Sequence, residues 1–402
     1  MTTLLGLEVA GRAVLVAGGG PVAARRISAL VADDAHVTVV APQLCEDLVD
    51  LVASAAVTWV EREVCEDDLV GAWLVHAATD DARTNAEVCR WATQRRVWSV
   101  CATAAPEGTA RTPAAVSHAG LAVGVVSHGA PDPARCAAVR DQLADALQLG
   151  QMDLRRRRGS GRGRVVLVGG GPGAEDLLTL RGRRALSEAD VVVTDRLGPT
   201  TLLADLPGDV EIIDVGKTPG RHPVTQDEIN RILVDQAQLG RTVVRLKGGD
   251  PYLYGRGGEE LAALAAHGIP AEVIPGISSA LSAPACAGIP LTHRGTVAAV
   301  HIAHGHGDLD DAAVAGVVAE SATLVILMGI AGLAGHATRL MDAGARPDLP
   351  VAVIERASLA TQRVTRAPLE EIVDAAAAVG VQAPAVIVVG AVAAMDLGGG
   401  PP

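Results

Sequence analysis

Two glycine-rich turns that follow apolar runs are the first places in this sequence where a ligand could bind. The run at residues 14–17 leads into Gly18-Gly19-Gly20-Pro21-Val22-Ala23, which fits the pattern G-x-G-x-x-A. Gly18 would allow a tight turn, Gly20 would let a pyrophosphate approach backbone N–H groups, and Ala23 would allow close helix–sheet contact. The acidic residue that holds a ribose hydroxyl is missing after the second strand, so a purely structural turn is the alternative. The candidate NAD-binding residues are Gly18, Gly20, Pro21, Val22, Pro42 and Gln43.

The second glycine turn indicates a different ligand. Residues 165–168 run into Gly169-Gly170-Gly171-Pro172-Gly173, whose spacing does not fit the pyrophosphate pattern. Pro172 also lacks the N–H that a phosphate would use. Further on, the run at 243–246 ends in Lys247-Gly248-Gly249-Asp250. Gly248 and Gly249 would let a ligand lie against the backbone, and Asp250 could accept hydrogen bonds from ribose hydroxyls or an amino group. Since α/β proteins bind ligands at the carboxyl ends of strands, both turns are candidate ligand loops.

Histidines and cysteines form no recognisable metal motif. His301, His304 and His306 alternate without a nearby cysteine, which favours loop or core histidines over metal ligands. The six cysteines include no Cys-x-x-Cys pair and no tight cluster, so neither a zinc site nor a disulfide framework is expected. The N-terminus lacks the regions of a signal peptide, and no apolar stretch predicts a membrane span. We therefore expect a cytoplasmic protein without a bound metal.

The elements that must position these loops indicate an α/β protein throughout. Before residue 150, β-branched runs at 13–17, 37–40 and 73–77 alternate with Ala-rich helical patterns such as 22–32. The alternation resumes with apolar runs at 165–168, 191–194, 243–246, 323–328, 351–355 and 386–389. Such alternation favours βαβ units and, in the first part, a Rossmann-like parallel sheet covered on both faces.

Length and composition limit the domains and the partners. The chain has 402 residues, which favours two or three domains. Four arginines at 155–158 open a Gly- and Arg-rich stretch, which we interpret as a flexible linker over 151–164 after a first domain over 1–150. The net charge of −12, with four Trp, two Tyr and no Phe, argues against nucleic acid as the main partner.

Further motifs accompany the first glycine loop. The loop continues through Arg25-Arg26, and Ala77-Ala78-Thr79-Asp80-Asp81, Asn85, Pro113-Ala114 and residues 125–129 follow it. Residues 5–145 thereby resemble the precorrin-2 dehydrogenase/ferrochelatase module of siroheme synthases. The resemblance implies NAD-dependent dehydrogenation and ferrochelation. Where that family has an aspartate implicated in proton handling, residues 99–105 contain no carboxylate, and Glu107 is the nearest one. The alternative is therefore a non-catalytic nucleotide-binding or dimerisation scaffold.

An ordered set of motifs follows the second glycine turn, at residues 195–197, 215–217, 245–251, 255–260, 273–279 and 288–294. Over residues 165–395 the chain resembles uroporphyrinogen-III C-methyltransferase, of the tetrapyrrole methylase fold. The resemblance implies two α/β lobes, over 165–276 and 277–402, with S-adenosylmethionine between them. The implied contacts of this methyl donor are Pro172, Gly248, Gly249, Asp250, Leu253, Ser278, Ser279, Met328 and Ala357.

The resemblance also implies two catalytic residues, Asp195 and Lys217. Methylation of a pyrrole carbon needs in-line alignment with the sulfonium methyl, so positioning and exclusion of water should supply most of the rate. Asp195 would take or relay the pyrrole proton, or stabilise the cation formed on attack, and Lys217 would orient a substrate carboxylate or tune Asp195. Without the family match, Asp195 is interpreted as a helix N-cap and Lys217 as a solvated lysine.

The implied reaction uses two S-adenosylmethionines to convert uroporphyrinogen III to precorrin-2, for siroheme or corrinoid biosynthesis. Because this substrate carries eight carboxylates, basic side chains should hold it. The candidates by sequence context are Arg181, Arg256, His293 and Arg294, each of which is otherwise an ordinary surface residue. Tyr252 and Tyr254, the two tyrosines of the chain, are expected to line the cleft. The family further implies a homodimer.

Overall fold

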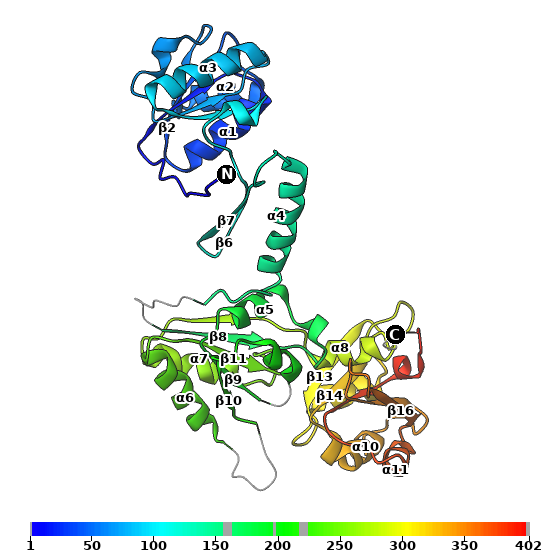
Figure 1. Ribbon diagram of the computed structural model, residues 1–402. Coiled ribbons are helices and arrows are strands. Elements are labelled where there is room, and N and C mark those ends of the chain that lie inside the picture. Colours follow the sequence, from blue (N-terminus) through cyan, green and yellow to red (C-terminus); the bar gives the residue numbers. More distant parts are fainter. Residues whose placement is uncertain (1, 156–162, 196–197, 217–223, 399–402) are drawn as a thin grey trace. The chain divides into compact units, whose positions relative to one another are not determined.

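The computed structural model describes residues 2–155, 163–195, 198–216 and 224–398. The chain separates into two compact units, Met1–Asp145 and Ala146–Pro402, which we call unit 1 and unit 2 (Figure 1). The predicted catalytic residue Lys217 lies outside the described residues, and so does the part of the predicted linker at 156–162.

Unit 1 is built on a five-stranded parallel sheet. Its strands are β1 (Ala13–Ala17), β2 (His36–Val40), β3 (Val57–Val60), β4 (Leu74–Ala77) and β5 (Trp98–Cys101), in the order β3-β2-β1-β4-β5. The helices α1 (Pro21–Ala32), α2 (Glu46–Ala53) and α3 (Ala82–Arg95) join them. Because side chains alternate along a strand, Val14 and Val16 pack in one apolar cluster and Leu15 and Ala17 in another. The predicted parallel sheet with both faces covered is confirmed.

Unit 1 also contains a β-hairpin that the apolar pattern did not predict. Its strands, β6 (Ala114–His118) and β7 (Leu121–Val125), pair antiparallel and are only half-buried or exposed. Helix α4 (Pro133–Gln148) follows and ends just inside unit 2. The hairpin strands contain three Val, but no two of them are consecutive, so they lack the β-branched run that marked the other strands.

The first half of unit 2 is a second parallel sheet. Its strands are β8 (Arg164–Gly169), β9 (Val191–Thr194), β10 (Glu211–Asp214), β11 (Thr242–Lys247) and β12 (Ala271–Ile274), in the order β10-β9-β11-β8-β12. The helices are α5 (Leu180–Ser187), α6 (Gln226–Gln238) and α7 (Gly257–Ala266). Apolar clusters again cover both faces. This order places the carboxyl ends of β9, β11 and β8 side by side, which brings the predicted ligand loops together.

The second half of unit 2 carries a mixed sheet. The strands β13 (Ala299–His304), β14 (Ala322–Leu327), β15 (Pro350–Glu355), β16 (Arg363–Pro368) and β17 (Ala385–Val389) lie in the order β13-β14-β17-β15-β16. Only β13 and β14 pair parallel, and the other three pairings are antiparallel. The helices are α8 (Ser279–Cys286), α9 (Asp311–Val318), α10 (Leu333–Asp342) and α11 (Ile372–Ala378). The α/β class predicted for the whole chain is confirmed.

Arg155 differs from the solvated linker arginine that its place in the arginine run predicts. Its guanidinium is only 7% exposed and lies 2.8 Å from the carboxylate of Asp153 and 2.6 Å from that of Asp209. The backbone N–H of Leu154 donates to the carbonyl of Ser187. Residues 154 and 155 are therefore anchored to the body of unit 2, because paired carboxylates let a guanidinium be buried.

Among the described residues, no helix is both long and apolar enough to cross a membrane.

Candidate active site

Three glycines hold the two ligand loops of unit 2 against each other. The N–H of Gly249 donates to the carbonyl of Gly171 at 2.7 Å, and the N–H of Gly171 donates back at 3.2 Å. A Cβ on Gly276 would stand 2.2 Å from the carbonyl oxygen of Gly249, so only glycine fits there. Asp250 completes the junction, since its two carboxylate oxygens accept from the N–H groups of Tyr252 and Gly276 at 2.8 and 3.1 Å. The main structural partners of this carboxylate are therefore backbone groups of the loop.

The remaining predicted contacts of the methyl donor lie on loops that converge on this junction. Ser358, beside Ala357, accepts a hydrogen bond from the N–H of Ala174, next to the Pro172 turn. Gly249 approaches Ser278 and Ser279, and Ser278 is the N-cap of α8. Leu253 packs against the apolar core of the mixed sheet. Met328 follows β14 in a left-handed conformation and is 41% exposed.

A buried ionic network lies beneath the same strand ends. Arg245 and Lys247 on β11 have side chains only 4% and 5% exposed, and Glu260 on α7 is fully buried. Glu260 accepts from Arg245 Nε at 3.1 Å and from Lys247 Nζ at 3.0 and 3.1 Å. Arg245 Nη2 lies 3.2 Å from Asp195 Oδ2. Two cations thus balance two carboxylates, and Asp195 is the member nearest to solvent, with 24% of its side chain exposed.

Burial lowers the pKa of Lys247, as does the neighbouring positive charge of Arg245, while the carboxylate of Glu260 opposes the shift. Asp195 is not the N-cap of the 3-10 helix η4 (Thr200–Asp205), because Pro199 occupies that position. The structure therefore pairs Asp195, the predicted catalytic carboxylate, with the guanidinium of Arg245, which also binds Glu260. Arg245, Lys247 and Glu260 lie within the sequence motifs at 245–251 and 255–260, but their pattern predicted no role for them.

The four predicted substrate-binding residues do not form one group. Arg181 pairs with Glu272 on the edge strand β12, and β11 and β8 lie between that strand and β9, which leads to Asp195. Arg256 pairs with Glu259 at 2.6 Å. His293 Nδ1 lies 3.3 Å from the hydroxyl of Thr296. All four residues are exposed, Arg294 included. Of the four, Arg181 is the residue that the strand order places away from Asp195, the predicted catalytic carboxylate.

The histidines near residue 301 take part in stacking and pairing. His301 Nε2 lies 3.3 Å from Asp310 Oδ2. The ring of Tyr254 packs edge-on against His304 with centroids 5.2 Å apart, and His304 lies 4.7 Å from His306. Across the parts of the chain that the structure covers, no three His, Cys, Asp or Glu side chains form a group suited to a metal ion. Tyr254 also donates to the carbonyl of Ile302, which ties the Gly248–Tyr254 loop to the mixed sheet.

In unit 1 the glycine loop has the geometry of a nucleotide loop. Gly18 has φ +117°, and a Cβ on it would meet the carbonyl of Ala78 at 2.4 Å. A Cβ on Gly19 would meet the carbonyl of Gln43 at 2.0 Å, a requirement that the sequence pattern did not reveal. Gly20 is the N-cap of α1, Pro21 begins that helix, and a Cβ on Gly20 would meet nothing within 4 Å. The approach to the helix N-terminus is thus open at Gly20, as pyrophosphate binding requires.

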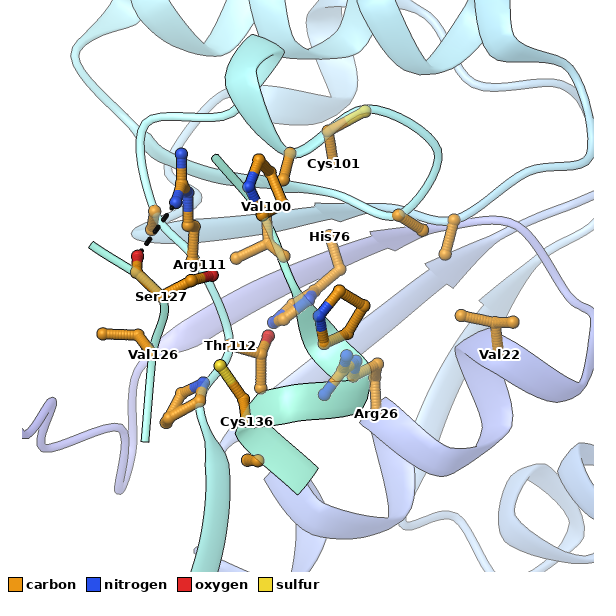
Figure 2. Close-up of a pocket in the computed structure, with 18 of the residues that line it drawn as sticks. Val22, Arg26, His76, Val100, Cys101, Arg111, Thr112, Val126, Ser127 and Cys136 are labelled. Carbon is orange, nitrogen blue, oxygen red and sulfur yellow. Dashed lines mark hydrogen bonds between the residues drawn. The ribbon is translucent and has the colours of Figure 1, made fainter. Parts of the chain in front are cut away.

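A cavity of about 340 Å³ lies beside this loop (Figure 2). Among its lining residues are Val22 and Arg26 of α1, His76 of β4, Cys101 of β5 and Cys136 of α4. Ala102 lines it as well, at the segment without a carboxylate. The carboxylate of Glu107 lies 3.9 Å from Cys101 Sγ, yet Glu107 is not among the lining residues.

Comparisons with known proteins agree with the two-unit organisation. Residues 164–373 match the family of tetrapyrrole (corrin/porphyrin) methylases, and residues 5–114 match a putative NAD(P)-binding family. The chain is 36% identical to siroheme synthase 3 of Aeromonas hydrophila, over 94% of this chain and 92% of that protein.

Two solved structures resemble part of the chain. One is uroporphyrin-III C-methyltransferase of Thermus thermophilus with S-adenosyl homocysteine, at 42% identity and a TM-score of 0.49, covering 57% of this chain and 98% of that one. The other is a cobalt precorrin-4 methyltransferase, at 25% identity and a TM-score of 0.52, covering 58% of this chain and 96% of that one.

Proposed function

Because the chain belongs to the siroheme synthase family, we propose that unit 2 methylates uroporphyrinogen III to precorrin-2 with S-adenosylmethionine as donor, and that Asp195 is its catalytic carboxylate. The observation that carries this assignment is the contact of Asp195 with a buried, anchored guanidinium at the strand ends that also bear the glycine loops. A carboxylate held in this way keeps its orientation when substrate arrives, as preorganised catalysis requires.

Methyl transfer breaks the sulfur–methyl bond of the donor and forms a carbon–carbon bond to a pyrrole carbon, which gives the ring a positive charge. Asp195 stabilises that charge and then takes or relays the proton that the ring loses. Arg245 fixes the position of the carboxylate through Nη2, while Glu260 binds Nε of the same guanidinium. Lys217 remains our candidate for orienting a substrate carboxylate or tuning Asp195, and Arg256, His293 and Arg294 for binding others.

We place the methyl donor on the loops of Pro172, Gly248, Gly249, Asp250, Leu253, Ser278, Ser279, Met328 and Ala357. The backbone contacts of Gly171, Gly249 and Gly276 and the exposed apolar or aromatic side chains of these loops support this placement. The exposed side chains are those of Tyr254, Ile277, Met328 and Leu359, which are 37–41% exposed. Apolar side chains left open around a loop junction are typical of a ligand-binding surface.

The donor site can be tested by adding one methyl group to its scaffold. Gly276→Ala would push a Cβ to within 2.2 Å of the Gly249 carbonyl and displace the Gly248–Asp250 loop. A displacement of about 1 Å in a site can cost two orders of magnitude in catalytic rate. We expect the same displacement to lower the affinity for S-adenosyl homocysteine about tenfold or more. Calorimetric titration measures this. Gly258→Ala is the matched control, because its Cβ meets nothing within 4 Å, and equal affinity in both variants would refute the placement.

The reaction itself is tested with purified protein, uroporphyrinogen III and S-adenosylmethionine without oxygen. The absorption spectrum should change to that of precorrin-2 or the trimethylated pyrrocorphin, and the change should require the methyl donor. If the spectrum does not change, the proposed methyl transfer is wrong.

For unit 1 we propose NAD binding at Gly18, Gly20, Pro21, Val22, Pro42 and Gln43. The open face of Gly20 at the start of α1 supports this. Gly20→Val should leave unit 1 folded, because the added side chain begins in open space, but should block the pyrophosphate and abolish NAD binding. Fluorescence titration with NADH measures binding, and full affinity in this variant would point to the structural-turn alternative. Sirohydrochlorin formed from precorrin-2 on addition of NAD would favour an active dehydrogenase over a scaffold.

We also propose the boundaries predicted above, 1–150, 151–164, 165–276 and 277–402, with a cytoplasmic homodimer as the assembly. The compact units themselves divide after Asp145, and residues 154 and 155 of this linker are held on unit 2. The end of the parallel sheet of unit 2 at Ile274 and the packing of α8 on the mixed sheet support the boundary at 276. Six free cysteines support a reducing compartment. Light scattering on the purified chain tests the dimer.

A further inference from the structure

The cavity of unit 1 contains a histidine that the proposed function does not use. His76 lies on β4, is 7% exposed and lines the cavity. Within the described part of the chain its ring has no hydrogen-bond partner. Figure 2 shows His76 from β4 and Arg26 from α1 in the same part of the cavity, which Thr112 and Cys136 also line. Arg26 likewise has no hydrogen bond or ion pair with any residue that the structure describes. A nearly buried imidazole and a guanidinium thus reach the same space without protein partners.

The other ionisable groups around the cavity do not neutralise this pair. Arg111 donates to the carbonyls of Ser127 and Gly129 at 3.3 and 2.9 Å. Asp132, the single carboxylate among the lining residues, accepts from the N–H of Arg135 at the start of α4. Cys101 of β5 and Cys136 of α4 supply thiols. The cavity therefore has an excess of positive charge.

Burial first, and a neighbouring positive charge second, lower the pKa values of both side chains. Burial, with the charge of Arg26 as a smaller cause, lowers the pKa of His76 to about 4. Burial and the charge of Arg25 also lower the pKa of Arg26. His76 is therefore neutral at pH 7 in the empty cavity. An anion placed between the two side chains would reverse the balance, because a nearby negative charge favours the protonated imidazole.

We propose that the unit 1 cavity binds an anionic oxygen group, a carboxylate or a phosphate, between Arg26 and His76, and that His76 takes up a proton when the group binds. Arg26 provides the permanent charge, and the fork of its guanidinium matches either kind of oxygen anion. His76 adds a second donor only in the bound state, so binding strengthens as the pH falls toward the pKa of the bound imidazole. This proposal rests on the ligand-binding function proposed for unit 1 and does not depend on methyl transfer in unit 2.

The titration of His76 tests the proposal directly. Full-length protein with ¹³C-labelled histidine gives one ring resonance for each of its 11 histidines, and His76→Gln assigns the relevant one. The resonance is followed against pH alone, with inorganic pyrophosphate, and with uroporphyrin, a stable oxidised octacarboxylate. We expect its midpoint to rise from about 4 to about 6 or higher with at least one probe. A rise with uroporphyrin alone identifies a carboxylate site, and a rise with pyrophosphate alone identifies a phosphate site.

Two arginine variants complete the test. Arg26→Gln should abolish the ligand-induced rise, whereas Arg25→Gln, at an exposed neighbour that does not line the cavity, should retain it. The other histidine resonances report whether each variant is folded, and Arg26→Lys should restore part of the rise. The proposal is overturned if neither probe moves the midpoint of His76, or if folded Arg26→Gln protein keeps the full rise.

Discussion

Asp195→Asn is expected to lower the rate of uroporphyrinogen III methylation by a factor of about 10² to 10⁴, the usual contribution of a general acid–base residue. The substitution keeps the size of the side chain and its ability to face Arg245 at 3.2 Å, but it removes the negative charge. The positive charge that develops on the pyrrole ring then has no counter-ion, and its proton has no acceptor. Initial rates from the absorption of the product, at saturating S-adenosylmethionine, measure the loss.

Binding of the methyl donor separates this catalytic role from a general defect. Because the proposed donor loops contact each other through backbone groups and not through Asp195, the affinity for S-adenosyl homocysteine should stay within about twofold of wild type. Asp205→Asn, which changes an exposed carboxylate at the end of η4, is the matched control and should keep the full rate. An Asp195→Asn protein that turns over at the wild-type rate would remove this residue from the mechanism.

Glu260→Gln is expected to cause the largest loss of stability. It leaves Arg245 and Lys247, with side chains 4% and 5% exposed, without their shared carboxylate. Breaking a buried ion pair from one side costs about 3–5 kcal/mol, because a desolvated charge loses its partner. In a domain of this size that lowers the melting temperature of unit 2 by roughly 10 °C. Differential scanning calorimetry of the whole chain measures the shift.

The neighbouring glutamate provides the control. Glu259 is 53% exposed and pairs with Arg256 at the surface, so Glu259→Gln should leave the melting temperature nearly unchanged. Equal shifts of the melting temperature in the two variants would mean that buried Glu260 contributes no more to stability than exposed Glu259. The rate of methylation should also fall in Glu260→Gln protein that remains folded. Arg245 then loses a carboxylate that holds its guanidinium in place for Asp195.

The pH dependence of Glu260→Gln supplies a second readout. Without Glu260 the pKa of Lys247 falls further below the ordinary lysine value of 10.5, because the attraction that opposes burial is gone. Between the two values the unfolded chain binds more protons than the folded one, so stability rises with pH in that window. The variant should therefore recover part of its stability between neutral pH and about pH 10 relative to wild type. A constant difference across this range would contradict a buried charged lysine.

The strands could be predicted where local pattern and burial agree. Apolar runs such as 191–194 and 386–389 became central strands because parallel or fully covered strands need apolar residues on both faces. The antiparallel pairing of β17 was not predictable, since a fully buried strand has the same pattern in either direction. The hairpin of β6 and β7 was missed because its half-exposed residues are small and show no clear alternation of apolar and polar types.

The glycine loops of the candidate site could be predicted from the sequence, whereas the partners of its buried charged side chains could not. Glycine turns leave a local signal, whereas the clash that requires Gly276 depends on a carbonyl from another loop. Arg245 and Lys247, two residues apart on one strand, point to the same face, and this was the signal for a buried ionic cluster. No local pattern tells that Glu260 turns inward and Glu259 outward, because helix position relative to the sheet decides it. His76 was missed because it lies within the apolar run at 73–77, and the run does not show that its ring lines a cavity.

The most direct test of the account is the fate of the donor methyl groups. The wild-type chain is incubated with uroporphyrinogen III and S-adenosylmethionine carrying a ¹³C-methyl group, and the tetrapyrrole is analysed by mass spectrometry and carbon NMR. We predict a product with two labelled methyl groups bonded to ring carbons, at a rate that Asp195→Asn lowers by about 10² or more. A tetrapyrrole that returns unlabelled, or labelled equally fast by the Asp195 variant, would contradict the proposed function or its catalytic residue, respectively.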